Sequence, residues 1–251
     1  VGTWGWRLPF LAAGPLGLLA RHVWLELEDS SVYQELSESE TGAAVGLGPL
    51  KTLLREHQRS LLVSIGVASL NAVGFYLVLT YLPTYLSNEL GFSSRASFLS
   101  VNISLLFYLL AIFVMGWLSD HVGRKRMLVV ASVGFVLFSV PLFMVMGTGQ
   151  LWKACLAEGV LCLFLTANDG TMASYLAESF PTELRYTGFA VSQNLANAVF
   201  GGTASAVCTW VIGVTGSRLA PAWYLTAVSL LSLCAMVASH EHTGRDLSEV
   251  V

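Results

Sequence analysis

Long apolar segments recur along the whole chain, and they constrain its fold more than any other feature of the sequence. A helix that crosses the hydrocarbon core of a bilayer needs about 17–25 mostly apolar residues. Hydrophobic residues make up 55% of the 251 residues and charged residues only 12%, about half the ~25% typical of soluble domains. We therefore predict an all-α integral membrane protein, an antiparallel helical bundle. Its spans are expected at about 6–25, 60–86, 97–118, 127–147, 151–176, 187–214 and 221–239.

The first of these segments is the weakest, because prolines and glycines interrupt it. Residues 8–20 also resemble the apolar core of a signal peptide, and that alternative stays open. Only Arg7 precedes the segment, and Trp4 and Trp6 suit a membrane interface. We therefore favour a membrane span for this segment.

A long polar stretch separates the first apolar segment from the other six. Residues 26–58 are acidic at first, then rich in glycine, and finally basic. Such a linker marks a boundary between structural units. We expect a transmembrane helix over 1–25, a central cytoplasmic linker over 26–58, a six-helix unit over 59–240 and a cytoplasmic tail over 241–251. The end of the linker, 49–59, either lies on the membrane surface or forms the first turns of the next helix.

The distribution of lysine and arginine predicts how the chain is oriented in the membrane. Cytoplasmic loops carry an excess of these residues. A cytoplasmic linker places nine of the 13 on the inner side and four on the outer side. The inner residues are Arg21, Lys51, Arg55, Arg59, Arg124, Lys125, Arg126, Arg185 and Arg245, and the outer ones are Arg7, Arg95, Lys153 and Arg218. We predict a multi-pass plasma-membrane protein with a cytoplasmic linker and C-terminus.

The short loop GWLSDHVGRKR, residues 116–126, concentrates charge between two apolar spans. Its basic residues Arg124, Lys125 and Arg126 fit the topology rule, but its other residues need a separate explanation. Gly116 allows close approach of a neighbouring helix. Gly123 permits a tight turn. Asp120 is placed to accept backbone hydrogen bonds or to pair with an arginine.

This loop resembles the signature of the major facilitator superfamily, which occurs between helices 2 and 3 and, more loosely, between helices 8 and 9. Two further stretches, AESFPTELRYTG (177–188) and NLANAVFGGTAS (194–205), resemble the metabolite:proton symporter branch of that family. Ser205 and Ser31 stand where that branch usually carries proline. The resemblance implies that Glu178 and Arg185 join Asp120 and Arg124 in a charge network at the inner face.

The resemblance covers only the second half of such a transporter. Residues 1–25 resemble helix 6, the linker resembles the central cytoplasmic loop, and the remaining spans resemble helices 7–12. The fold expected is therefore the six-helix C-terminal half of a major facilitator, plus one preceding helix. Family members transport through a cavity between two six-helix halves, so the partners implied are the lipid bilayer, a small solute and an N-terminal half missing from this chain.

The function implied is secondary active transport by alternating access: proton-coupled symport of a small polar metabolite, such as an organic acid or a zwitterion. The proton gradient is the energy source, and no cofactor is implied. Two alternatives remain open. The chain is a truncated fragment that does not transport, or it pairs with another copy or a separately made N-terminal half.

Two carboxyl groups lie inside one predicted span. Glu158 and Asp169 are eleven residues apart, which turns a helix by about 20° beyond three full turns and separates them by about 16 Å. Both therefore point the same way. Ionisable groups inside a membrane usually face a cavity or a partner, so either they bind a cationic group or a proton, or neighbouring helices satisfy them.

Amide and small side chains form a stripe on the next span. Asn194, Asn197, Gly201, Ala204 and Cys208 recur at helical spacing. The stripe either packs against another helix through hydrogen bonds or borders the transport pathway, and the glycines at 201 and 202 are a possible bend. Asn71, in the span 60–86, is a weaker candidate of the same kind.

Neither an enzyme nor a metal site is indicated. The five histidines form no cluster with acidic residues at a membrane face, and neither HExxH nor GxSxG occurs. The four cysteines have no zinc-type spacing. The net charge of −3, without a basic tract, gives no reason to expect nucleic acid as a partner.

Overall fold

The computed structural model describes residues 4–26 and 48–239. The chain divides into two units, Val1–Ala44 and Val45–Val251. In the first unit, a short turn, η1 (Gly5–Arg7), leads into α1 (Leu8–Glu26). The apolar stretch of this helix, Phe10–Leu25, is shorter than the spans of the second unit. Most of the predicted linker and the whole predicted tail lie outside the described residues.

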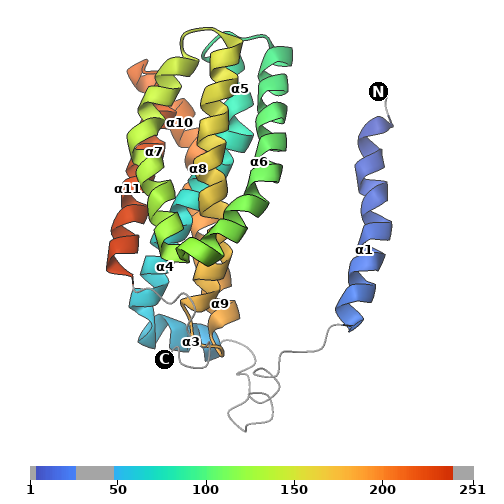
Figure 1. The fold of residues 1–251 in the computed structure, drawn as a ribbon, viewed down its shortest axis with the longest axis vertical. Helices are drawn as coiled ribbons and strands as arrows, with labels where there is room; N and C mark the ends of the chain where they lie inside the picture. Colours follow the sequence, from blue (N-terminus) through green and yellow to red (C-terminus); the bar gives the residue numbers. More distant parts are fainter. Residues whose placement is uncertain (1–3, 27–47, 240–251) are drawn as a thin grey trace. The chain divides into compact units, whose positions relative to one another are not determined.

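The second unit contains six helices that are long and apolar enough to cross a membrane (Figure 1). This confirms the predicted all-α membrane fold. Four of the six are single α-helices: α6 (Ser94–Val122), α7 (Arg124–Met146), α8 (Leu151–Glu178) and α11 (Ala220–Ala238). The other two contain π-helical turns. They are α4 (Gln58–Gly74) with η2 (Phe75–Tyr81) and α5 (Leu82–Asn88), and α9 (Arg185–Ala196) with η3 (Asn197–Gly201) and α10 (Gly202–Thr215).

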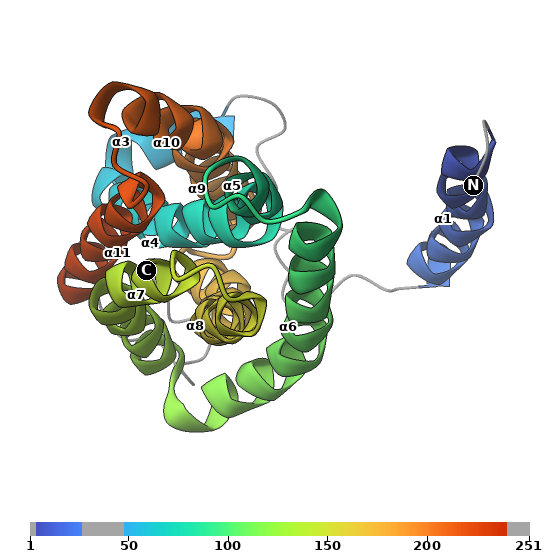
Figure 2. The same cartoon turned by 90° about the horizontal axis from the view of Figure 1, so that it is seen from above.

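Helix α8 lies between α6 and α7, and α11 packs against both α7 and α4 (Figure 2). Helix α4 packs in turn against α9. Many large apolar side chains on the outside of α6 are exposed, including Phe113 and Trp117. A soluble protein does not leave so much apolar surface uncovered, whereas lipid solvates it. The buried core contains Leu70, Val73, Leu77, Phe135, Leu161 and Leu165.

Local signals explain where two of the helices begin. The hydroxyl of Ser93 accepts a hydrogen bond of 3.2 Å from the Ala96 amide, which caps the first turn of α6. Pro221 occupies the first turn of α11, where its missing N–H costs nothing. Such caps matter at membrane helix ends because the first amides have no partner within the helix.

The short segment before the first span forms a helix of its own, α3 (Gly48–Glu56). His57 has a non-helical backbone conformation and separates α3 from α4. Leu53 of α3 is fully buried in a small cluster with Leu61 and Phe180. Of the predicted segment 49–59, residues 49–56 therefore belong to a separate helix, and residues 58–59 begin α4.

The loop between α6 and α7 is a single residue. Gly123 has φ of 106° and ends α6, with its amide donating to the Ser119 carbonyl at 3.0 Å. Residues with a Cβ rarely adopt such a positive φ. The loop predicted over 116–126 is therefore almost entirely helical, and Gly116 lies inside α6, against Gly170 of α8. A Cβ on Gly170 would come within 3.0 Å of the Ile112 carbonyl oxygen and 3.1 Å of the Gly116 nitrogen. The backbones of α6 and α8 are therefore in direct contact there.

Candidate functional site

Polar side chains from four helices meet around Asp169 of α8. The side-chain amide of Asn71 in α4 donates to Asp169 Oδ1 at 2.8 Å. The hydroxyl of Tyr108 in α6 donates to Asp169 Oδ2. Gln193 of α9 donates from Nε2 to Asn71 Oδ1 at 3.3 Å. We call Asn71, Tyr108, Asp169 and Gln193 the Asp169 cluster.

The cluster is polar, largely enclosed and incompletely satisfied. Asn71 and Tyr108 are 5% and 6% exposed, whereas Asp169 and Gln193 are half-buried. Gln193 Oε1 is buried and has no hydrogen-bond partner within the described part of the chain. A buried acceptor without a partner is costly, so a ligand that donates hydrogen bonds is favoured here. The cluster therefore offers oxygen acceptors, one of them carrying a formal charge, to an N–H or ammonium group.

The second carboxyl of α8, Glu158, occupies a different environment. Its side chain is fully buried. The hydroxyls of Ser100 and Ser104 in α6 both donate to Glu158 Oε2, at 2.7 and 2.9 Å. The two carboxyls predicted to share one face of the helix thus both contact α6, but through separate sets of partners.

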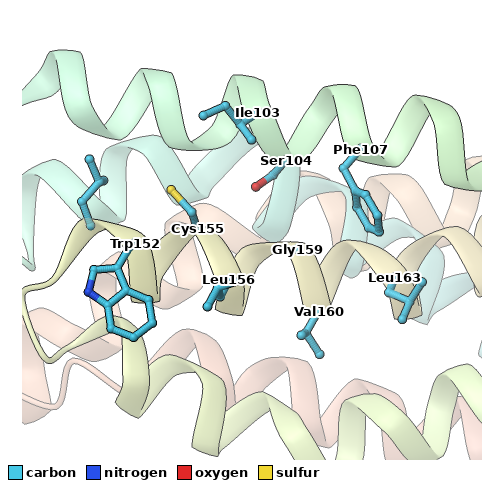
Figure 3. Close-up of a pocket in the computed structure, with 10 residues that line it drawn as sticks. Ile103, Ser104, Phe107, Trp152, Cys155, Leu156, Gly159, Val160 and Leu163 are labelled. Carbon is cyan, nitrogen blue, oxygen red and sulfur yellow. The ribbon is translucent and has the colours of Figure 1, made fainter.

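A groove of about 810 Å³ runs between α6 and α8 beside Glu158. Figure 3 shows its walls, which are mainly apolar and aromatic side chains such as Phe107, Trp152 and Leu156. Among the labelled lining residues, Ser104 carries a hydroxyl, Cys155 a thiol and Trp152 an indole nitrogen. Ser104 thus lines the groove and also donates to Glu158.

The predicted stripe of amides and small residues does not act as one unit. Asn194 is exposed and donates to the Ala190 carbonyl of its own helix at 2.8 Å. Asn197 is half-buried at the start of the π-helical turn η3. Gly201, Ala204 and Cys208 are buried, and a Cβ on Gly201 would come within 2.7 Å of the Tyr76 ring. These three small residues serve helix packing, and the structure brings neither asparagine into the Asp169 cluster.

The charged residues of the predicted inner network gather where α6, α7 and α8 end or begin. Arg124 lies 3.5 Å from Asp120 and also forms an ion pair with Glu178. The side chain of Asp120 is 61% exposed and that of Glu178 only 15%, so water weakens the first pair much more than the second. Arg185 donates from Nε to the Ala177 carbonyl at 2.8 Å.

Lys125 and Arg126, in the first turn of α7, contact backbone carbonyls. Lys125 Nζ donates to the Ser239 carbonyl at the end of α11, at 2.5 Å. Arg126 donates to the Val122 carbonyl at 3.4 Å. Arg59 reaches the Ala238 carbonyl, also at 3.4 Å. Cations at a helix C-terminus are favoured by the helix dipole, so Lys125 and Arg59 hold the end of α11 against α7 and α4.

Comparison with known proteins decides the family. The family model described as "Major Facilitator Superfamily" matches residues 1–206. The chain belongs to the major facilitator superfamily. The predicted resemblance is thereby confirmed, and the chain is that of a transporter family rather than an enzyme.

Several curated members of the superfamily align with almost the whole chain. The glycine betaine/proline/ectoine/pipecolic acid transporter OusA of Dickeya dadantii is 33% identical over 251 residues, covering 98% of this chain and 50% of the relative. The proline/betaine transporter of Escherichia coli is 32% identical and covers 97% and 50%. The ectoine/proline transporter ProP of Corynebacterium glutamicum is 30% identical, with the same coverage. The chain thus spans about half the length of these relatives.

Two members of the Asp169 cluster in this major facilitator chain were not among the predicted site residues. Tyr108 lies in the apolar run LLFYLL, where an aromatic residue reads as packing. The sequence feature that could have identified Tyr108 is its spacing: it lies four residues after Ser104 and eight after Ser100. This spacing places three hydroxyls on one face of a helix. Gln193 adjoins the predicted Asn194, and a shift of one residue turns the side chain by about 100°.

Proposed function

We propose that the chain forms half of a secondary transporter that moves a small polar solute across the plasma membrane together with protons, by alternating access. The observation that carries the proposal is the Asp169 cluster, in which a half-buried carboxylate and an unsatisfied amide oxygen join four helices. Polar groups at membrane depth are expensive and are retained mainly where they bind something.

The solute class proposed is a zwitterion with a cationic nitrogen. The Asp169 carboxylate attracts the positive charge of that nitrogen, and Gln193 Oε1 accepts a hydrogen bond where the nitrogen carries an N–H. The relatives named above are transporters of proline, glycine betaine, ectoine or pipecolic acid, which supports this class. Because the partners of Asp169 come from α4 and α6, a solute that competes for its oxygens also changes how these helices contact α8.

The inner charge network is proposed to close the cytoplasmic side in one of the two transport states. Arg124 pairs with both Asp120 and Glu178 and thereby links α6, α7 and α8. An exposed pair contributes only about 0–1 kcal/mol. The weak Arg124–Asp120 pair suits a gate, because both states of a transporter must remain populated. The cytoplasmic placement of this face, of the linker and of the C-terminus belongs to the same proposal.

A specific observation favours a second candidate, a half-length chain that inserts in the membrane without transporting. The chain spans 50% of the length of its relatives, and transport in this fold uses a cavity between two halves. In that case activity requires a second, N-terminal half, supplied separately or by another copy.

Uptake into proteoliposomes tests the proposal. The chain is reconstituted in two samples: alone, and together with the N-terminal half of the E. coli proline/betaine transporter, which we call the paired sample. Uptake of labelled proline and glycine betaine is measured in both, with and without an imposed proton gradient. We expect gradient-driven uptake in the paired sample and its loss in Asp169→Asn. The matched control is Asn102→Ala, since Asn102 bonds only the Phe98 carbonyl of its own helix and is exposed.

The outcomes separate the candidates. Uptake only in the paired sample identifies a half-transporter, and uptake in neither sample supports the non-transporting chain. Uptake that Asp169→Asn leaves unchanged removes the Asp169 cluster from the pathway.

A further inference from the structure

Glu158 is a fully buried carboxyl, and the described residues give it no cationic partner. It is 0% exposed. One oxygen, Oε2, accepts both serine hydroxyls, whereas Oε1 is buried and has no hydrogen-bond partner in the described residues. No lysine, arginine or histidine of the described ranges forms an ion pair with it. An uncompensated buried charge costs several kcal/mol or more, so the arrangement leaves Oε1 as a site for a proton.

The neighbouring helices bring no charge to Glu158. On its own helix the nearest titratable groups are the thiols of Cys155 and Cys162, and Cys155 Sγ lies 3.2 Å from Ser100 Oγ. Helix α7 has no charged side chain after Arg126. Three tyrosines on the elements packed against α8 are engaged elsewhere: Tyr108 bonds Asp169, Tyr81 bonds Thr209, and the Tyr76 ring lies against Gly201. The other titratable or charged groups on these elements lie toward helix ends: Arg59, Arg95, Asp120, His121, Arg124, Lys125, Arg126, Arg185 and Tyr186.

The two carboxyls inside α8, Glu158 and Asp169, are connected through one face of α6. Ser100, Ser104 and Tyr108 recur every four residues, which places them along one side of the helix. The two serines donate to Glu158 and the tyrosine donates to Asp169. A change in the hydrogen bonds at Glu158 therefore acts on the same helix that holds Asp169.

We propose that Glu158 binds and releases the coupled proton, whereas Asp169 serves the solute, and that the hydroxyls of α6 connect the two events. This inference rests on the proposed function. With the proton on Oε1, the serine hydroxyls donate to Oε2 as observed. When the proton leaves to water, both oxygens become acceptors and the negative charge needs further donors. The contacts between α6 and α8 then rearrange, and the hydrogen bond from Tyr108 to Asp169 changes with them.

The groove between α6 and α8 comes close to Glu158 and is the proposed route for its proton. Ser104 lines the groove (Figure 3). Its Oγ also donates to Glu158, so one hydroxyl connects the carboxyl with the groove. The apolar walls keep the carboxyl from being solvated permanently. A proton site needs both properties, because permanent solvation removes the link between protonation and helix packing.

Infrared difference spectroscopy tests the assignment without requiring transport. The full chain is placed in lipid nanodiscs, and spectra are recorded while the pH is cycled. We expect a reversible protonated-carboxyl band that is absent in Glu158→Gln and retained in Asp169→Asn. The double variant S100A/S104A should keep the band and shift it to higher frequency, because the carbonyl loses two donors. A band that persists in Glu158→Gln overturns the proposal, as does one that S100A/S104A leaves unshifted.

Transport measurements on the paired sample provide a second test of the role of Glu158. Glu158→Gln should keep solute exchange across the membrane but lose accumulation driven by the proton gradient, and Asp169→Asn should lose both. Accumulation by Glu158→Gln overturns the proposal, and so does a Glu158-dependent response to sodium at fixed pH, which identifies a different coupling ion. If the infrared results hold but no sample transports any solute, the proposed function fails and Glu158 remains only as a proton-binding carboxyl.

Discussion

The contact between Gly170 and Gly116 yields a prediction that can be worked out from the structure, because α8 provides its own control. An added methyl group on Gly170 would lie 3.0 Å from the Ile112 carbonyl oxygen and 3.1 Å from the Gly116 nitrogen. Both are backbone atoms of α6, so the contact can be relieved only by moving the helix. The same methyl group on Gly159 meets nothing within 4 Å, since it projects into open space beside the groove.

The expected magnitudes follow from two opposing effects. Alanine in a helix is favoured over glycine by about 0.8–1.0 kcal/mol, and both variants gain this. Overpacking costs about 1–3 kcal/mol, and only Gly170→Ala bears it. We therefore expect Gly159→Ala to be stabilised by up to about 1 kcal/mol and Gly170→Ala to be less stable than Gly159→Ala by about 1–3 kcal/mol.

Unfolding by SDS titration in mixed micelles, followed by circular dichroism and tryptophan fluorescence, measures the difference in the free energy of unfolding between the two variants. Equal stabilities of Gly159→Ala and Gly170→Ala would refute the close contact between α6 and α8. A Gly170→Ala variant more stable than the unmodified chain would contradict the close contact even more strongly.

Three further predictions concern the site and the loop. Tyr108→Phe removes the hydrogen bond to Asp169 and should lower the free energy of unfolding in the same titration by roughly 0.6–1.7 kcal/mol; no change would mean that the bond does not form in the membrane. Gln193→Ala should reduce binding of labelled proline by the paired sample, whereas Asn194→Ala should not, and equal effects would contradict the placement of these two amides. Gly123→Ala forces φ of 106° on a residue with a Cβ and should cost about 1–3 kcal/mol, measured as a lower thermal midpoint; an unchanged midpoint would argue against the single-residue turn.

The inner charge network was predicted in part from a sequence motif. The motif placed Asp120 and Arg124 in one loop, and the resemblance added Glu178 and Arg185 from a distant part of the chain. The structure brings Arg124 into contact with both carboxylates. Only the structure distinguishes the two carboxylates: the side chain of Asp120 is 61% exposed and that of Glu178 is 15% exposed. These exposures depend on how α8 ends beside the turn between α6 and α7.

The polar residues inside the membrane show where the sequence was insufficient. Periodicity along α8 placed Glu158 and Asp169 on one face, and both do contact α6. It did not separate their partners, which are two serines in one case and an asparagine and a tyrosine in the other. On α9 the predicted Asn194 points away from the cluster and its neighbour Gln193 enters it, because the rotation of a helix about its axis is set by what it packs against.

The sequence by itself determined that this chain is a membrane protein with long helices, and it placed the ends of the six spans to within four residues, since both depend on local properties: apolar length and turn residues. It also carried the family, through a loop motif of fixed spacing. The tertiary structure alone decided which helices touch, where π-helical turns interrupt two of the spans, and which donors each carboxyl of α8 receives. Those features depend on contacts between residues far apart in the chain, such as Ser100 with Glu158, 58 positions apart, and Asn71 with Gln193, 122 positions apart. A periodic pattern within one helix carries no information about its neighbours.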